Sequence, residues 1–429
     1  MKKKVLLVGG GGREHSIARK LCQSPELGQL YVAPGNVGTA QVAENVPIAA
    51  MDIGGLLAFA LKKEVELTVV GQDDPLAFGI VDEFQANGLK IFGPTKAAAQ
   101  IEASKAFSKR MMRRCGVPTS PFYVYTHYDR AFDKICGHFY HHEETPIVVK
   151  ASGLARGKGA YVCHDFNTAE RALDEIMIER RYGNAGDEVI IEDFVRGPEV
   201  SVHAFCDGKS FKLFPSAQDH KQVSDGDIGL NTGGMGAIAP VPWFDSYSEV
   251  SAQIVGPILE GLRKDDSPLV GILYPGLKIP ETGTKVLEFN ARFGDPETQV
   301  YMRLLNTDLL GILEACVEGR LNEINIEWNP GFAACIVMAS GGYPSPDYKS
   351  GFPVTGIDEA EKLPGVVVFH AGTKQVGGHL VTSGGRVLAV TGIGETLQGA
   401  IDLAYEGVKR IHFKGAHYRK DIGSKSLGL

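Results

Sequence analysis

The chain has 429 residues with 44 lysines and arginines against 51 aspartates and glutamates, a formal net charge of −7. A hydrophobic fraction of 44% with 22% charged residues excludes wholesale disorder, and the length suggests about two to four domains. The mild acidity argues against a general nucleic-acid binder, which needs a basic face, and no apolar run approaches the ~18–20 residues of a membrane span. Seven scattered cysteines without C-x-x-C spacing indicate reduced thiols. We therefore expect a cytoplasmic protein that binds neither nucleic acid nor membrane.

Residues 1–103 alternate short apolar runs with helical patterns. Strands are predicted at 5–8, 30–33, 68–70 and 90–92, with helices over 13–23, 57–63 and 76–86. This rhythm predicts a parallel sheet covered by helices on both faces. Ligands of such sheets bind beyond the carboxyl ends of the strands, where two glycine-containing turns, 9–12 and 33–36, fall.

Residues 104–327 have a mixed α+β pattern. A helix is predicted over 105–115 and another near 168–180, with strands at 147–150, 160–163, 188–194, 199–206 and 211–215. The polar, glycine-rich stretch 218–240 has neither helical nor strand periodicity, and loops of that length are usually functional or disordered. Its mixture of Asp, His, Lys, Asn and Gly favours function.

Residues 328–429 predict a third, mixed unit. Strands are expected at 334–339, 366–371, 380–382 and 387–391, the last two joined as a hairpin through 383–386, before a helix over 395–411. The predicted fold class is therefore α/β and α+β, with an N-terminal parallel-sheet domain, a central domain and a C-terminal mixed domain.

The glycine run 9–12 follows a strand and opens a helix. Backbone amides there, helped by the helix dipole, could hold a phosphate or a sugar phosphate. The dinucleotide fingerprint G-x-G-x-x-G fails because its last position is Glu14, where a small residue is needed. A merely structural turn remains an alternative, and a NAD site is disfavoured.

The segment 285–293 carries the strongest local pattern. Side chains of a strand alternate between its faces. Alternation would point Leu287, Phe289, Ala291 and Phe293 into a core and place Glu288, Asn290 and Arg292 on the other face. A carboxylate beside an amide oxygen suits Mg²⁺, whose other ligands are waters and substrate phosphates. The alternative is a solvated face with a chance ion pair.

Three further patterns each allow a functional and a purely structural interpretation. Lys150 ends an apolar strand and is followed by the glycine-rich turn 153–159, which could hold a polyphosphate, although it could also be a surface hairpin. Glu199 could accept hydrogen bonds from ribose hydroxyls or face water. His138, His141 and His142 have metal-like spacing without a third ligand, so we expect a solvated loop there.

Several blocks resemble, in their order, the phosphoribosylamine–glycine ligase family of the ATP-grasp superfamily. These blocks are residues 9–15, 33–36, 92–96, 218–221, 231–236, 288–297 and 417–423. The resemblance covers essentially the whole chain. It implies that ATP phosphorylates glycine and that 5-phosphoribosylamine attacks the glycyl phosphate, giving glycinamide ribonucleotide, ADP and phosphate in purine biosynthesis. A non-catalytic nucleotide-binding regulatory protein of the same fold is the alternative.

The resemblance also implies an organisation and a set of site residues. Domains would span 1–103, 104–327 (the ATP-grasp domain, with a small lid at about 120–192) and 328–429, in a monomer. Glu288 and Asn290 would hold Mg²⁺ or Mn²⁺, and Arg292, Asp295 and Asp219 would be catalytic. ATP would contact Lys105, Lys150, Gly157, Lys158, Gly159, Glu192, Asp193, Val195, Glu199 and Leu287. The amine sugar and glycine would contact Gly10, Gly11, Gly12, Arg13, Pro34, Gly35, Asn36, His220, Lys221 and Asn231. Ser152 and Arg156 depart from the family's usual Asp and Ala, which leaves the ATP affinity open.

Overall fold

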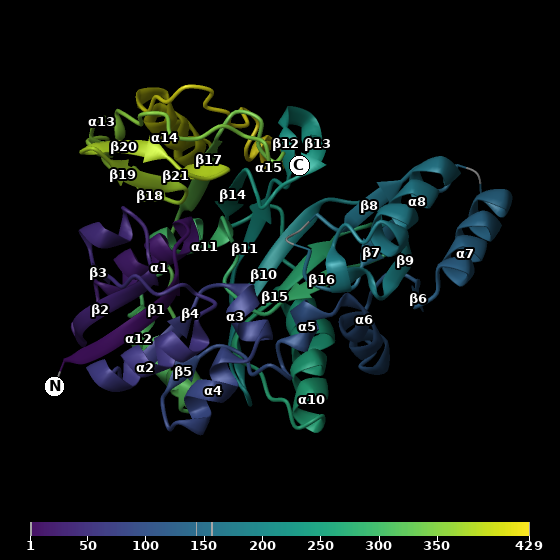
Figure 1. Cartoon of the computed structure of the whole chain (residues 1–429), viewed down its shortest axis with the longest axis horizontal. Helices are drawn as coiled ribbons and strands as arrows, with labels where there is room; N and C mark the ends of the chain where they lie inside the picture. Colours follow the sequence, from purple (N-terminus) through teal and green to yellow (C-terminus); the bar gives the residue numbers. More distant parts are fainter. Residues whose placement is uncertain (1, 143, 156–157, 429) are drawn as a thin grey trace.

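The computed structural model describes residues 2–142, 144–155 and 158–428. Its N-terminal part is a five-stranded parallel sheet with strand order β3-β2-β1-β4-β5 (Figure 1). The strands are β1 (Lys3–Gly9), β2 (Leu27–Pro34), β3 (Glu44–Asn45), β4 (Leu67–Val70) and β5 (Ile91–Phe92). The helices are α1 (Gly12–Leu21), α2 (Ile53–Lys63), α3 (Asp73–Ala77) and α4 (Ile80–Ala86). The parallel sheet expected from the alternating pattern is confirmed.

The helix predicted over 76–86 is divided into α3 and α4. Gly79 separates them in a left-handed conformation, with φ of 91°, which a glycine adopts without steric cost. Helix α2 begins at Ile53, before the predicted start at 57, because the side chain of Asp52 caps it by accepting a hydrogen bond from the amide of Gly55. The apolar strands β1 and β4 are almost wholly buried, as is typical of strands inside a parallel sheet.

A small antiparallel sheet projects from the middle of the chain, at the right of Figure 1. Its order is β6-β9-β7-β8, formed by β6 (Phe122–Tyr125), β7 (Ile147–Ala151), β8 (Ala160–Cys163) and β9 (Val189–Asp193), with α7 (Tyr128–His141) and α8 (Phe166–Leu173) packed beside it. The loop predicted for the histidine cluster is wrong, since His138 and His141 lie on α7. Ala131, Ile135 and Phe139 form its buried stripe.

The largest sheet has eight strands, in the order β16-β15-β10-β11-β14-β17-β21-β18, and runs through the rest of the molecule. Its strands are β10 (Glu199–Asp207), β11 (Phe211–Asp219), β14 (Gly236–Ala239), β15 (Val270–Lys278), β16 (Lys285–Asn290), β17 (Phe332–Ala339), β18 (Val367–His370) and β21 (Arg386–Gly394). The pairing of β14 with β17 carries this sheet from the middle of the chain into its C-terminal part.

Two expectations about strands are wrong. The stretch 218–240 is not free of strands: it contains β14 and the two-stranded ribbon of β12 (Gln222–Ser224) and β13 (Ile228–Asn231). The strands expected to pair through 383–386 do not form a hairpin. Instead β20 (His379–Thr382) pairs with β19 (Thr373–Val376), while β21 joins the large sheet.

The remaining helices cover the large sheet and its flanks. They are α5 (Gln100–Ala103), α6 (Lys105–Arg114), α9 (Tyr247–Glu249), α10 (Gly256–Lys264), α11 (Glu297–Leu304), α12 (Leu309–Val317), α13 (Ile357–Glu361), α14 (Leu397–Arg410) and α15 (Ser424–Leu427). One core cluster joins Val5 of β1 and Ile17 of α1 to Phe205 and Tyr301 of the central part. Of the helices in the described ranges, none has the length and apolar character that crossing a bilayer requires.

Candidate functional site

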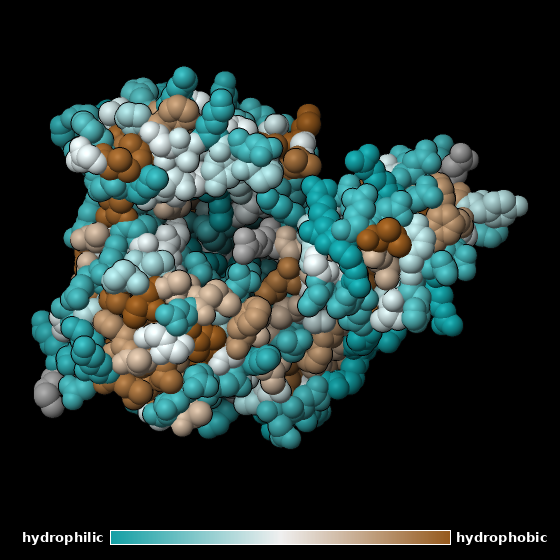
Figure 2. All heavy atoms as spheres, in the orientation of Figure 1, coloured by the Kyte–Doolittle hydropathy of each residue, from teal (hydrophilic) through white to brown (hydrophobic). Residues whose placement is uncertain are grey.

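A cavity of about 620 Å³ opens where the carboxyl ends of β1 and β2 face the start of β21 and the loop after β16. Figure 2 shows the molecular surface hollowed between the N-terminal part, the C-terminal part and the projecting small sheet. Residues that line this large cavity include Gly10, Gly11, Gly12, Pro34, Gly35, Gln72, Lys158, Asp295, Tyr343 and Arg386. Seven of the residues predicted to contact ligands or take part in catalysis therefore line this one cavity. They are Gly10, Gly11, Gly12, Pro34, Gly35, Lys158 and Asp295.

The turn that opens α1 is already partly satisfied by its own helix. The amide of Gly11 donates to Glu14 Oε2 at 2.7 Å, and Glu14 Oε1 pairs with Arg13 Nε at 2.6 Å. Arg13 also donates to Phe293 O at 3.1 Å and is buried, so it holds α1 against the loop after β16 and does not line the large cavity. An anion at this turn would need amides other than that of Gly11.

Asn36 is likewise a structural residue in this structure. Its Nδ2 donates to Gly10 O, Gly11 O and His370 O at 2.8–3.2 Å, and its Oδ1 accepts from Gly38 N and Thr39 N. All the hydrogen-bonding capacity of this amide is used within the protein. Asn36 therefore shapes the rim of the large cavity and is not among the residues that line it.

Asp295 and Arg386 form an ion pair on the cavity wall. Arg386 Nη2 lies 2.7 Å from Asp295 Oδ2, and Gln299 Nε2 donates to Asp295 Oδ1 at 2.7 Å. Burial would raise the pKa of Asp295, but Arg386 and Arg13 lower it below its usual value. The carboxylate therefore stays ionised beside a guanidinium that the sequence patterns did not single out.

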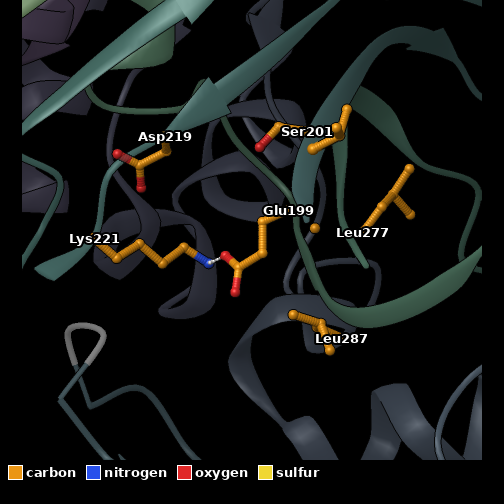
Figure 3. A pocket seen from close by; sticks show the side chains of 8 residues that line it. Glu199, Ser201, Asp219, Lys221, Leu277 and Leu287 are labelled. Carbon is orange, nitrogen blue, oxygen red and sulfur yellow. Dashed lines mark ion pairs between the residues drawn. The ribbon is translucent and has the colours of Figure 1, made fainter. Parts of the chain in front are cut away.

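A second, narrower cleft lies between β10, β11, β15 and β16 and is called here the inner cleft. It is lined by Glu199, Val200, Ser201, Asp219, Lys221, Gly276, Leu277 and Leu287. In Figure 3 the ammonium of Lys221 reaches toward Glu199 across this cleft. Lys221 Nζ is 3.6 Å from Glu199 Oε2 and 3.8 Å from Glu288 Oε1, and so stands between two carboxylates predicted to touch ATP and metal.

The carboxylate of Glu288 is held strongly ionised. Burial alone would raise its pKa, but Lys221, Lys105 and Lys150 lower it to about 2. The same balance acts on Glu199, whose pKa is lowered by Lys221 and by Lys278, with Lys278 Nζ 3.1 Å from Glu199 Oε1. Lysines from four different segments thus converge on these two acids, an arrangement that would also attract a polyphosphate.

Leu287 is not a core residue, contrary to the alternation expected for 285–293. The register of β15 and β16 shifts here, because Leu277 pairs with Val286 while Gly276 pairs with Glu288. The extra residue is a β-bulge, which turns the side chain of Leu287 into the inner cleft beside Leu277 (Figure 3). The prediction that Leu287 points into the core is therefore wrong. Its position in the inner cleft is compatible with the predicted contact to ATP, which stays a prediction.

Glu288 and Asn290 lie on the same face of β16, as the alternation predicts. Both side chains are only partly buried, and Asn290 Oδ1 accepts a hydrogen bond from Arg292 Nη2 at 3.2 Å. The described residues contain no group of three His, Cys, Asp or Glu side chains that could hold a metal alone. Two hard oxygen donors with phosphates and waters as the remaining ligands fit Mg²⁺, so the donor set suits the predicted ion.

Arg292 is fixed by an acid that sequence reasoning missed. Arg292 Nε is 3.2 Å from Glu102 Oε1, and the guanidinium lies 5.8 Å from the ring centroid of Tyr274. Glu102 is itself oriented by the amide of Ala291, which donates to Oε2 at 2.7 Å. Burial raises the pKa of Glu102, and the nearby Arg292 opposes that rise.

Glu192 is buried in an ion-paired cluster. Its Oε2 lies 2.5 Å from Lys109 Nζ and accepts from Ser120 Oγ at 3.0 Å, while its Oε1 pairs with Lys150. Burial lowers the pKa of Lys109 to about 8, although Glu192 opposes this. Lys109 lies one helical turn after Lys105 on α6, and that i,i+4 spacing is a sequence signal that could have identified it.

Asp219 lines the inner cleft beside Lys221. Its Oδ1 is buried and has no hydrogen-bond partner among the described residues. Burial and the neighbouring Glu297 raise the pKa of Asp219 well above its ordinary value. Lys221 and Arg386 oppose this rise.

Other predicted residues lie outside both pockets. His220 is fully buried, its Nε2 accepts from the amide of Gly423 at 3.1 Å, and burial lowers its pKa to about 4. Asn231 accepts from Gln222 Nε2 within the β12–β13 ribbon. Asp193 is exposed, and neither it, Val195 nor Gly159 is among the lining residues of the two pockets. Gly157 and Arg156 lie outside the described residues.

Three family models match consecutive parts of the chain. Residues 3–102 match the N domain of phosphoribosylglycinamide synthetase, residues 103–298 its ATP-grasp (A) domain, and residues 333–425 its C domain. Together the three models cover most of the chain.

Whole-chain relatives agree with these models. The phosphoribosylamine–glycine ligase of Caldanaerobacter subterraneus subsp. tengcongensis is 45% identical, covering 98% of this chain and 99% of the relative. The enzyme of the same name from Nostoc sp. is 47% identical, with coverage of 98% and 99%. The crystal structure of phosphoribosylamine–glycine ligase from Thermotoga maritima superimposes with a TM-score of 0.84 at 32% identity, covering 98% of this chain and 100% of that one. The biotin carboxylase domain of the Hydrogenobacter thermophilus 2-oxoglutarate carboxylase, at 15% identity, a TM-score of 0.74 and coverage of 97% and 92%, shares the fold. The chain belongs to the phosphoribosylamine–glycine ligase family.

Proposed function

We propose that this protein ligates glycine to 5-phosphoribosylamine at the expense of ATP, in de novo purine biosynthesis. The γ-phosphoryl group of ATP passes to a carboxylate oxygen of glycine, which gives glycyl phosphate and ADP. The amine nitrogen then attacks the acyl carbon, the bond from that carbon to the phosphate oxygen breaks, and phosphate and a proton leave. The products are glycinamide ribonucleotide, ADP and phosphate.

The observation that carries this proposal is the convergence of lysines on Glu288 and Glu199, together with a large cavity at the carboxyl ends of a parallel sheet. Lys105 and Lys150 are the cations that we assign to the ATP phosphates. Glu199 is assigned to the ribose hydroxyls, and Leu287 to the apolar wall against the nucleotide. Phosphoryl transfer depends on this positioning and charge neutralisation more than on covalent chemistry by the protein.

Glu288 and Asn290 are proposed to hold Mg²⁺, with Mn²⁺ as a substitute. A divalent ion there would neutralise negative charge on the ATP phosphates while the γ-phosphoryl group passes to the glycine carboxylate. Lys221 Nζ lies 3.8 Å from Glu288 Oε1. When a metal ion binds Glu288, the ammonium must therefore either remain beside the same carboxylate or move away from it. Arg292, oriented by Glu102, is aimed at the acyl phosphate and stabilises charge that develops on it.

The amine sugar is assigned to the large cavity. Its walls offer the backbone of Gly10, Gly12 and Gly35 together with Lys158 and the Asp295–Arg386 pair. A cavity of about 620 Å³ accommodates a phosphorylated pentose, since small-ligand pockets have volumes of roughly 300–1,000 Å³. Asp219, on the wall of the inner cleft, is proposed to lie at the glycine side.

A regulatory protein of the same fold is the weaker alternative. Such a protein would not need an oxygen pair for a metal close to phosphate-binding lysines, and in this chain Lys105 and Lys150 both act on Glu288. We further propose the domain division 1–103, 104–327 with a lid at about 120–192, and 328–429, which the ranges of the family models support. A monomer in the cytoplasm is proposed from the small-molecule substrates and from the seven free cysteines.

The test is ADP release with Mg²⁺, ATP, glycine and freshly generated phosphoribosylamine, with each component omitted in turn. Formation of glycinamide ribonucleotide that needs all four components is the expected result. ATP turnover with another acid or amine would overturn the substrate assignment while leaving the fold in place. ATP binding without turnover on any acid and amine would favour the regulatory alternative.

A further inference from the structure

Arg386 is the first residue of β21 and comes from the C-terminal part of the chain. It lines the large cavity, and only 22% of its side chain is exposed. Its guanidinium is nevertheless bound almost entirely by the protein. Nη2 pairs with Asp295 Oδ2 at 2.7 Å, and Nη1 donates to Asp295 O at 3.1 Å.

The same guanidinium also binds a turn far away in the sequence. Nη1 donates to Gly233 O and approaches Gly234 O at 3.5 Å. This turn connects the β12–β13 ribbon to β14. One arginine thus joins the Asp295 loop, at the large cavity, to the Gly233–Gly234 turn.

The Gly233–Gly234 turn also packs directly against a residue of each pocket region. Gly234 has a φ of 107°, and a Cβ placed on it would lie 2.4 Å from Pro296 Cδ and 2.8 Å from Asp219 Oδ1. Only a glycine allows such an approach, so the turn, the Asp295–Pro296 loop and the Asp219 carboxylate are packed without space between them. A displacement of the turn would reach Asp219 in the inner cleft as well as Asp295 in the large cavity.

From these contacts we propose that Arg386 is a positioning residue for the amide-forming step. It aligns the wall of the amine-sugar cavity with the cleft in which the acyl phosphate forms. The inference rests on the proposed function and adds a residue to it. Arg386 acts through Asp295 and the Gly233–Gly234 turn, since its hydrogen-bonding groups are engaged by these protein acceptors.

Misalignment at this point has a specific consequence. An acyl phosphate reacts with water when the amine is not in place, and errors of about 1 Å in the relative position of reacting groups cost up to about 100-fold in rate. Loss of Arg386 should therefore release ADP without amide formation, whereas the formation of the acyl phosphate, which depends on ATP and glycine, should continue. The stoichiometry of the reaction reports on position in a way that simple loss of stability does not.

The experiment compares wild type with Arg386→Met, Arg386→Lys and the control Arg410→Met. Arg410 is an exposed arginine at the end of α14 whose Nη1 donates only to Glu359 O at 3.1 Å in the described part of the chain. ADP and glycinamide ribonucleotide are measured together, with ATP affinity followed by calorimetric titration. Wild type and Arg410→Met should form one product per ADP.

For Arg386→Met we expect clearly more than one ADP per product, a kcat/KM for phosphoribosylamine lower by up to about 100-fold, and an ATP affinity within about twofold of wild type. Guanidinium ion added to Arg386→Met should restore part of the coupling, and Arg386→Lys should fall between the two. One ADP per product in Arg386→Met would overturn the inference. So would parallel losses of ATP affinity and product in both variants, because Arg386 would then only hold the fold. Absence of any turnover in wild type would instead refute the proposed function.

Discussion

Replacing Glu192 by glutamine removes the negative charge that lies between two buried ammonium groups. The side chains of Glu192, Lys109 and Lys150 are 2%, 3% and 9% exposed, so water screens this cluster very little. Glutamine keeps the shape of the side chain and can still bond to Ser120 Oγ. The variant therefore tests charge, with little change in packing.

The magnitude follows from the cost of leaving a buried charge without its partner. Removing one member of a buried ion pair typically lowers the free energy of unfolding by about 3–5 kcal/mol. Here one carboxylate serves two lysines, so we expect a loss in the upper part of that range. The pKa of Lys109 should fall further, because burial already lowers it to about 8 with Glu192 present.

The assay is urea unfolding of wild type and Glu192→Gln, followed by fluorescence and circular dichroism. Glu188→Gln is the matched control on the segment that leads into β9. Its carboxylate pairs with Arg110, whose side chain is 52% exposed, so the change should cost less than about 1 kcal/mol. The double variant Glu192→Gln/Lys109→Met should recover part of the stability lost. Equal stability of Glu192→Gln and Glu188→Gln would refute the argument that this cluster is a desolvated charge network.

Three other predictions concern the site and its surroundings. Glu288→Ala should abolish metal-dependent ADP release and weaken Mn²⁺ binding measured by electron paramagnetic resonance, with little change in unfolding, and wild-type activity in this variant would contradict the metal assignment. Lys105→Met should weaken binding of a non-hydrolysable ATP analogue by about 1.5–3 kcal/mol, since one charge-assisted hydrogen bond to phosphate is lost, while its present bond to Gly153 O is long at 3.3 Å. His220 is buried with its pKa lowered from 6.5 to about 4, so the unfolded chain takes up this proton first and stability is lost as the pH falls from about 6.5 to about 4. In His220→Gln, unfolding measured across that range should depend less steeply on pH, by up to about 1.4 kcal/mol per unit, and an unchanged slope would show that His220 is not held neutral.

The elements that sequence patterns predicted are those whose partners are set by local periodicity. Strands β1 and β4 are apolar runs buried inside a parallel sheet, and α6 and α14 carry their apolar stripes at helical spacing. The pattern failed where pairing over long distances decides the structure. The turn at 383–386 has hairpin residues, but β21 gains a longer partner in β17, about fifty residues earlier in the chain.

Within the site, the spacing of residues predicted which side chains share a face of a strand, but it did not predict which other side chains surround them. Glu288 and Asn290 share a face of β16 as expected, yet the β-bulge at Leu287 reverses the face of the residue between Val286 and Glu288. Strict alternation cannot foresee a bulge, because the bulge arises from the register with β15. Glu192 was expected to contact ATP, but its pairing with Lys109 and Lys150 could not be foreseen, because it depends on helix α6 packing against β9.

The residues that sequence reasoning missed are counter-charges, and this has a common physical cause. A buried charge needs a partner, so Arg292 and Asp295 each imply an opposite charge somewhere in the fold. The chain supplies Glu102 for Arg292 from about 190 residues earlier, and Arg386 for Asp295 from about 90 residues later. From the sequence alone, any of the 44 basic residues could be the partner of Asp295 and any of the 51 acidic residues the partner of Arg292. Existence of a partner is therefore predictable from the motif, whereas its identity is decided by how the eight-stranded sheet brings the C-terminal part of the chain beside the loop after β16.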